Sequence, residues 1–298
     1  MNISFSQFLR RTLVTVITLV LPTLNVTAED ARYQVERKND ITFASPGGVD
    51  LLMDLYLPKG VENPPLIMFI HGGGWKNGDR KNCKLAWTAA HGYAIASVEY
   101  RLSQEALFPA QIHDCKGALR WLRAHQSEYG YDASTVIVAG TSAGGHLAAL
   151  MGTSGDVAEL EGETAGNLDQ SSRIQAVIDY YGPADFLKRS KEHPAKTEEP
   201  SGSVYQLLGG PVKENQEAAR VASPITYVSK DDPPLLILHG DKDKTVYPGQ
   251  SEAFAAKYEA TGLDVKLQFE PGKGHGWKET SAAEREAVLV FLKKHFGR

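Results

Sequence analysis

A serine between two glycines is the first candidate for chemistry in this chain. Residues 140–144 read G-T-S-A-G, directly after the apolar run 136–139 and directly before an apolar helical pattern. A sharp turn between a strand and a helix presents a serine hydroxyl above the sheet, as a nucleophile requires. Tight turns also favour small residues for steric reasons alone, so a role for Ser142 depends on partners elsewhere in the chain.

Candidate partners follow two later apolar runs. In L-L-I-L-H-G-D-K-D-K-T-V, Asp241 and Asp243 lie just beyond residues 235–238, and in F-E-P-G-K-G-H-G-W, His275 lies beyond residues 265–269. A serine hydroxyl needs a general base to become nucleophilic, and the base needs an acid that orients it. The residues therefore predict Ser142 with His275 as base, and they leave either aspartate open as the acid.

A third motif could stabilise negative charge. Residues 71–75 read H-G-G-G-W after the apolar run 66–70. Consecutive glycines suit a tight bend or a close backbone approach, and their N–H groups can face a developing oxyanion. A loop that only needs positive φ angles is the alternative explanation.

The elements that would position these motifs alternate between short apolar runs and longer helical patterns. This alternation predicts an α/β fold with a mostly parallel central sheet, an antiparallel N-terminal hairpin and helices on both faces. The hairpin is expected from residues 41–43 and 51–57, with its turn at Pro46. The remaining strands are expected at 66–70, 93–98, 136–139, 176–180, 235–238 and 265–269, and helices at 109–125, 251–258 and 282–296.

The chain is expected to consist of a short leader and one domain. Residues 1–28 carry Arg10 and Arg11, then the apolar stretch 13–24, then small residues up to Ala28, which predicts a signal peptide and a secreted or periplasmic protein. The apolar stretch is shorter than a membrane span requires. Residues 29–298 are expected to form a single domain, with a lid-like insertion near 187–221 that is rich in Lys, Glu, Pro and Gly.

The overall charge argues against one class of partner. The formal net charge is −4, and it becomes −6 without the two arginines of residues 1–28. A nucleic-acid partner is therefore not expected, because phosphate binding needs a basic surface. No metal site is expected either, since the two cysteines, Cys83 and Cys115, match no ligand spacing.

Together, the three motifs resemble those of the α/β-hydrolase superfamily. H-G-G-G-W with G-T-S-A-G-G-H-L-A is similar to the hormone-sensitive-lipase-like carboxylesterases, but Thr141 stands where those enzymes usually carry an acid. H-G-D-K-D-K-T-V resembles the corresponding segment of secreted acetyl, acetylxylan and feruloyl esterases. The resemblance implies a serine esterase without a cofactor, in which Asp243 is the acid and the N–H groups of Gly73, Gly74 and Ala143 form the oxyanion hole.

Other side chains are assigned supporting roles. Four aromatic residues just past strand ends are candidates for the substrate pocket or for packing: Trp75, Tyr181, Phe186 and Trp277. His146, four residues after Ser142 on the expected helix, is interpreted as a packing residue, because a helix carries it away from the hydroxyl. Cys83 is expected on the first helix after the glycine loop, and Cys115 on the next helix. In the superfamily these two helices usually cover opposite faces of the sheet, so no disulfide is expected.

These observations lead to one functional hypothesis and two alternatives. The expected activity is hydrolysis of short acyl (acetyl) or feruloyl esters, on a small molecule or a polysaccharide, through an acyl-enzyme. An amide hydrolase, either a peptidase or an arylformamidase, would use the same triad. A catalytically silent binding module is the alternative from another class, although such modules usually lose a member of the triad, and none is missing here.

Overall fold

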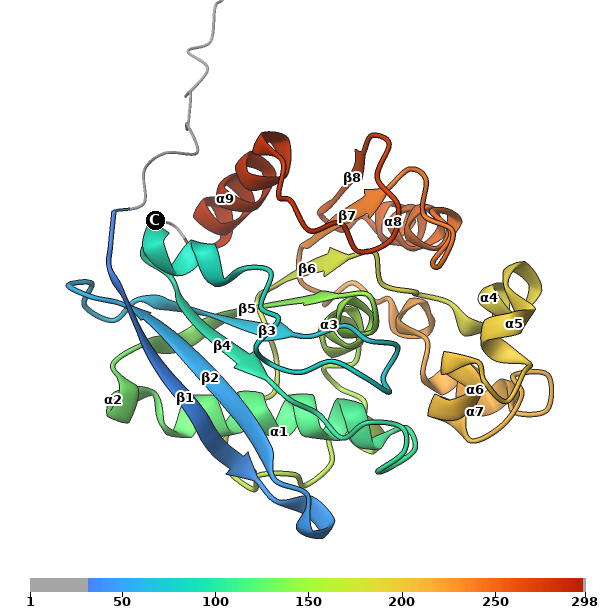
Figure 1. The fold of residues 1–298 in the computed structure, drawn as a ribbon, viewed down its shortest axis with the longest axis horizontal. Helices are drawn as coiled ribbons and strands as arrows, with labels where there is room; N and C mark the ends of the chain where they lie inside the picture. Colours follow the sequence, from blue (N-terminus) through green and yellow to red (C-terminus); the bar gives the residue numbers. More distant parts are fainter. Residues whose placement is uncertain (1–31, 297–298) are drawn as a thin grey trace, which may run out of the picture.

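Eight strands form one sheet in the structure, a computed structural model that describes residues 32–296. The predicted signal peptide, residues 1–28, lies outside the described residues. The strand order is β1-β2-β4-β3-β5-β6-β7-β8, and all pairs from β4 to β8 are parallel, while β1 and β2 add antiparallel edges (Figure 1). The predicted mostly parallel sheet with an antiparallel N-terminal hairpin is confirmed.

The strands lie within a few residues of the predicted ranges except at the first. β1 begins six residues before the expected hairpin strand, since it continues to pair with β2 along a largely exposed edge. The strands are β1 Val35–Ala44, β2 Leu51–Pro58, β3 Pro65–Ile70, β4 Ala94–Val98, β5 Asp132–Thr141, β6 Ala176–Tyr180, β7 Leu235–Gly240 and β8 Val265–Glu270.

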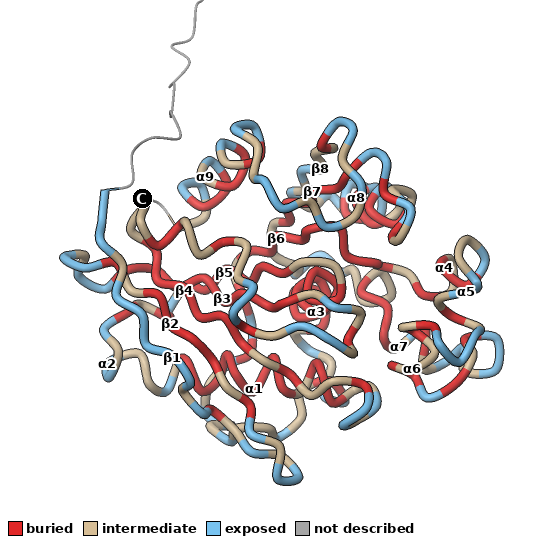
Figure 2. Tube along the Cα trace, in the orientation of Figure 1, coloured by how far each residue is buried: buried red, intermediate tan, exposed pale blue. Residues whose placement is uncertain are grey.

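Helices cover both faces of the sheet because the central strands are apolar on both sides. Along β3, Met68 packs in one core and Phe69 in the other, as the two-residue period of a strand requires. One core receives α1 (Ala110–Ala124), α3 (Ala143–Thr153) and α8 (Gly249–Thr261), and the other receives η2 (Ala86–His91) and α9 (Ala282–Phe296). Figure 2 shows β3, β5 and α3 as a continuous buried centre.

The segment expected as an insertion folds into four short helices. They are α4 Phe186–Glu192, α5 Pro194–Thr197, α6 Ser203–Leu208 and α7 Gln216–Val221, which lie together at the right of Figure 1. The other short elements are α2 Gln126–Tyr129, η1 Pro46–Gly48, η3 Ala158–Leu160 and η4 Pro224–Tyr227. Within residues 32–296, no helix combines the length and apolar character needed to cross a bilayer.

One expectation about local structure is wrong. Cys83 does not lie on a helix, because residues 76–85, with Asn77, Gly78 and Asp79, form turns and η2 begins only at Ala86. Cys83 packs toward the core of η2 and α9, whereas Cys115 of α1 is buried in the other core. Both cysteines are free thiols, as expected from their placement on opposite faces of the sheet.

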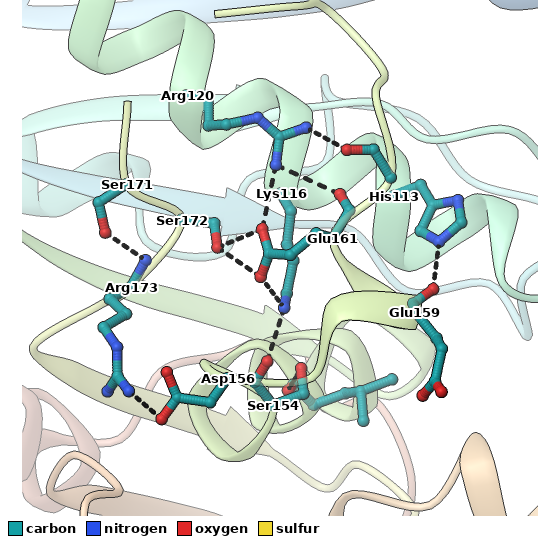
Figure 3. Close-up of polar contacts among 12 residues, drawn as sticks. His113, Lys116, Arg120, Ser154, Asp156, Glu159, Glu161, Ser171, Ser172 and Arg173 are labelled. Carbon is teal, nitrogen blue, oxygen red and sulfur yellow. Dashed lines mark hydrogen bonds and ion pairs between the residues drawn. The ribbon is translucent and has the colours of Figure 1, made fainter. Parts of the chain in front are cut away.

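A buried ionic network ties α1 to the end of α3. Lys116 is 0% exposed, and its ammonium donates to the Ser154 carbonyl and to Glu161 Oε1 (Figure 3). Arg120 donates to Glu161 Oε2 and to the backbone carbonyls of Gly162 and Thr164. Burial lowers the pKa of Lys116, and its bond to Glu161 acts in the opposite direction. Glu161 therefore compensates a charge that has no access to water.

Replacing Glu161 with alanine should destabilise the fold. The Glu161→Ala change leaves the Lys116 ammonium buried without its counterion, which costs about 2–4 kcal/mol in comparable buried pairs. Urea unfolding at neutral pH measures the difference in the free energy of unfolding. Glu163→Ala removes an exposed carboxylate from the same loop and is expected to change that free energy by about 0.5 kcal/mol or less. Equal losses in the two variants would contradict this role of Glu161.

Candidate active site

Ser142 sits in the sharp turn between β5 and α3. Its backbone has φ 54° and ψ −114°, a left-handed conformation that side chains other than glycine rarely adopt. The Ser142 N–H donates to the Tyr180 carbonyl at 2.8 Å, and the Ser142 carbonyl accepts from the His146 N–H at 2.9 Å. Both sides of the turn are thus fixed by the neighbouring strand β6 and by the first turn of α3.

The glycines around Ser142 permit close packing of backbones. A Cβ on Gly144 would lie 2.0 Å from the Ile70 carbonyl oxygen, and one on Gly140 would lie 2.2 Å from the Gly144 carbonyl oxygen. Gly145 has the same constraint, since its Cβ would approach Asp179 Oδ1 to 2.3 Å. The space that these glycines leave is filled by protein atoms, so they seat α3 against the sheet.

The structure brings Ser142, His275 and Asp243 together at the carboxyl ends of β5, β7 and β8. His275 Nε2 lies 2.9 Å from Ser142 Oγ, and His275 Nδ1 lies 2.6 Å from Asp243 Oδ2. In this arrangement Nδ1–H donates to the carboxylate and Nε2 is free to accept the serine proton. Asp241 is exposed and accepts instead from the Gly272 N–H at 2.7 Å. The carboxylate that contacts the histidine is that of Asp243.

Asp243 is held ionised by a dense set of donors. Burial alone raises the pKa of this carboxyl, which is only 3% exposed, but bonds from His239, His275 and the Thr245 N–H outweigh burial and bring the pKa well below its usual value. The Val246 N–H also donates to Oδ1 at 3.0 Å. Asp243 is therefore a fixed negative charge beside the base.

The three other histidines near the motifs brace the site. His239 lies 3.2 Å from Asp243 Oδ2 and also contacts the Val246 carbonyl at 2.9 Å. His146 is fully buried; burial lowers its pKa to about 4, and its Nδ1 accepts from the Trp75 indole at 3.3 Å. His71 contacts the Gly72 carbonyl at 2.7 Å and stacks on Tyr100. None of the three replaces His275 next to Ser142.

The expected oxyanion-hole residues lie on the glycine loop and at the start of α3. Within residues 32–296, the N–H groups of Gly73, Gly74 and Ala143 donate to no protein acceptor. Gly73 has φ 121°, and a Cβ there would lie 2.0 Å from the Asn77 carbonyl oxygen, so only glycine fits. Ala143 is the first residue of α3, where the helix dipole favours negative charge. These groups can stabilise an oxyanion.

A cavity of about 450 Å³ opens beside Ser142 and His275. Its wall includes residues 72–77 of the glycine loop, Thr141, Tyr181, Pro183, Arg189, Lys196, Ser203, Thr245, Val246 and Gly276. No group of His, Cys, Asp and Glu side chains in the described range is arranged to hold a metal ion. The site thus combines the contacts from Ser142 through His275 to Asp243 with a small cavity.

Comparison with known proteins places this site in a family. The family model BD-FAE matches residues 53–258, which is more than half of the chain. The chain belongs to the BD-FAE family. The resemblance to α/β-hydrolase serine esterases, inferred from the motifs, is thereby confirmed at the level of family and fold.

Proteins similar to this BD-FAE chain include several that are named as esterases. Esterase LipC of Mycobacterium tuberculosis is 31% identical over 81% of this chain and 61% of its own length, and Esterase LipQ of the same organism is 31% identical over 90% and 64%. A truncated carbohydrate esterase from gut microbiota superposes with a TM-score of 0.80 at 29% identity, covering 91% of this chain and 99% of that one. The chain spans about three fifths of the length of the two mycobacterial relatives.

Two of the four candidate pocket aromatics do not line the BD-FAE cavity. Trp75 and Tyr181 are part of its wall, and Tyr181 packs edge-on against His275. Phe186 is fully buried behind Trp75, with ring centroids 5.5 Å apart, because α4 turns it into the core. Trp277 packs on the far side of Tyr181 and donates to Glu284 at 2.7 Å. The last two residues support the wall from behind.

Three polar residues of the cavity could not be assigned to it from the sequence. Arg189, Lys196 and Ser203 come from α4, α5 and α6, in the segment interpreted only as a polar insertion. Short helices carry little periodicity, and the segment turns back over the glycine loop through tertiary contacts alone. Ser203 Cβ, for example, would lie 3.2 Å from a Cβ on Gly74.

Adding one methyl group at Gly144 should disrupt the sharp turn between β5 and α3. In Gly144→Ala the new Cβ meets the Ile70 and His71 carbonyl oxygens at 2.0 and 2.6 Å, and backbone cannot yield as a side chain can. Overpacking of this kind is expected to lower the free energy of unfolding by about 3 kcal/mol or more. Gly155→Ala is the control, since its Cβ meets only the Arg173 side chain, at 3.4 Å. Urea unfolding measures the free energy of unfolding of both variants. An unchanged value for Gly144→Ala would show that the turn can relax around the new methyl group.

Proposed function

We propose that this chain is a serine esterase that cleaves carboxylic esters through an acyl-enzyme. The observation that carries the proposal is the continuous hydrogen-bonded path from Ser142 Oγ through His275 to Asp243, at 2.9 and 2.6 Å. The family and the esterase names of the relatives support the same activity. The chain's own residues can perform every step of this reaction.

The first half of the reaction forms the acyl-enzyme. Ser142 Oγ bonds to the ester carbonyl carbon while its proton passes to His275 Nε2, and the carbonyl oxygen becomes an anion. The N–H groups of Gly73, Gly74 and Ala143 would bind that anion, and Asp243 stabilises the imidazolium. The carbon–oxygen bond to the alcohol then breaks, and the departing alkoxide takes the proton from His275.

The second half releases the acid. A water molecule gives a proton to His275 Nε2 and attacks the acyl carbon, which forms a second oxyanion in the same place. The bond to Ser142 Oγ breaks, and the serine recovers its proton from His275. The products are a carboxylic acid and an alcohol, and the enzyme returns to its starting state.

The proposed substrates are short acyl esters, with acetyl or feruloyl groups on a small molecule or a polysaccharide. A cavity of about 450 Å³ suits a small acyl group together with part of the alcohol, and Trp75 and Tyr181 provide flat apolar walls. The similarity to a carbohydrate esterase supports a sugar as the alcohol. Comparing acetylated xylan, methyl ferulate and 4-nitrophenyl octanoate tests this class, and a preference for the octanoate would contradict it.

Variants of the triad test the mechanism. With 4-nitrophenyl acetate, Ser142→Ala is expected to lower kcat by a factor of about 10⁴ or more, and Asp243→Asn by about 10³–10⁴, because the base is lost or wrongly oriented. Asp241→Asn is the matched control and should retain activity within about fivefold, since Asp241 contacts only the Gly272 N–H. Full activity of Ser142→Ala, or a greater loss at position 241 than at 243, would overturn the assignment.

We also propose that the protein is exported to the periplasm or the medium. Arg10 and Arg11, the apolar stretch 13–24 and the small residues before Ala28 support this proposal. Expression of the full chain in a bacterial host should yield a mature protein that begins at Glu29, which intact-mass measurement detects. Recovery of the uncut chain from the cytoplasm alone would contradict export.

A further inference from the structure

The active-site cavity is lined by positive charge in a chain that is negative overall. Its wall contains Lys76, Arg189 and Lys196, and none of the described wall residues is an aspartate or glutamate. The whole chain, in contrast, has a formal net charge of −4. A cavity with low-dielectric walls strengthens the field of such charges, so it favours an anionic group.

Arg189 has donors that no protein group uses. The residue is 3% exposed, and its Nη2 donates to the Thr245 carbonyl at 2.9 Å. Its Nε is buried without an acceptor, and its Nη1 donates to no acceptor within residues 32–296. A buried guanidinium normally pairs with a carboxylate, because an uncompensated donor costs free energy.

Nearby carboxylates are already engaged with other donors. Asp243 accepts from His275 and from the Thr245 and Val246 N–H groups. Glu192 pairs with Lys188 and accepts from Gln250. Burial lowers the pKa of Arg189 to about 10, so the guanidinium remains protonated at neutral pH although it has lost most of its hydration.

The position of Arg189 is fixed relative to the catalytic residues. Its bond to the Thr245 carbonyl joins α4 to the loop whose Thr245 N–H donates to Asp243 at 2.7 Å. Arg189 and Lys196 also share the wall of one cavity with Ser142 and His275. Lys196 lies on α5 and forms no ion pair among the described residues. Neither cation has a direct ion-pair partner among the described residues, and both border the place where the ester must bind.

We propose that Arg189, assisted by Lys196, binds a carboxylate on the substrate, so that the preferred esters carry a negative charge in their acyl or alcohol part. The inference rests on the proposed esterase function and narrows its substrate class to acidic esters, such as acylated sugar acids or half-esters of dicarboxylic acids. The planar guanidinium matches a carboxylate in geometry and supplies charge-assisted hydrogen bonds. Its bond to Thr245 keeps it in place before the substrate arrives.

Two pairs of rigid substrates of equal shape test the proposal. 4-Acetoxybenzoate and 4-acetoxybenzamide differ only in a charge on the alcohol part. Methyl 4-carboxybenzoate and methyl 4-carbamoylbenzoate differ only in a charge on the acyl part. In at least one pair the wild type is expected to show a kcat/KM about 10- to 100-fold higher for the carboxylate, which is the usual range for a charge-assisted hydrogen bond.

Variants assign the preference to Arg189. Arg189→Met should lower kcat/KM for the preferred carboxylate by about 10- to 100-fold more than for its neutral amide partner. Arg189→Lys keeps the positive charge but lacks the planar guanidinium with its paired donors. This variant should therefore retain part of the preference for the carboxylate. Lys191→Met removes an exposed charge from the same helix and is expected to retain the full preference.

The outcomes separate this inference from the proposed function. Equal kcat/KM within both pairs for the wild type overturns the carboxylate subsite while leaving the esterase intact. Equal losses for charged and neutral esters in Arg189→Met and in Arg189→Lys would mean that Arg189 only braces Thr245. If the wild type hydrolysed none of these esters, the proposed esterase function itself would be contradicted.

Discussion

The site depends on the close approach of α3 to the sheet. Gly140, Gly144 and Gly145 let the first turn of α3 approach β3, β5 and β6 closely, and this contact holds Ser142 in a conformation that the serine would not adopt by itself. The same contact places the Ala143 N–H at the positive end of the helix. Ser142 and the Ala143 N–H are thus fixed by one packing constraint.

The far end of α3 is restrained as well. Lys116 donates to the Ser154 carbonyl at the C-terminus of the helix, and Glu161 links this ammonium to Arg120 (Figure 3). Glycine contacts fix one end of α3 and an ionic network fixes the other. A helix held at both ends keeps the backbone of Ser142 within the small tolerance that hydrogen bonding to His275 requires.

Much of this arrangement could be predicted from the sequence, because strong local patterns carry it. Apolar runs located the central strands, and the order of Ser142, Asp243 and His275 after three of them indicated the triad. The expected helix at Cys83 was wrong because turn residues precede η2. Phe186 and Trp277 stayed open between lining the pocket and packing, because strand-end position does not fix the direction of a side chain. Arg189 was missed because its contact with Thr245 spans 56 residues and leaves no trace in local periodicity.

The helices α4–α7 supply part of the cavity wall from a separate segment of the chain. Ser142, Asp243 and His275 lie just beyond the ends of β5, β7 and β8. Arg189, Lys196 and Ser203, in contrast, all come from one uninterrupted stretch between β6 and β7. Ser142, Asp243 and His275 are therefore encoded outside the stretch that supplies these three wall residues. Mutation within that single stretch alters part of the cavity wall without replacing Ser142, Asp243 or His275.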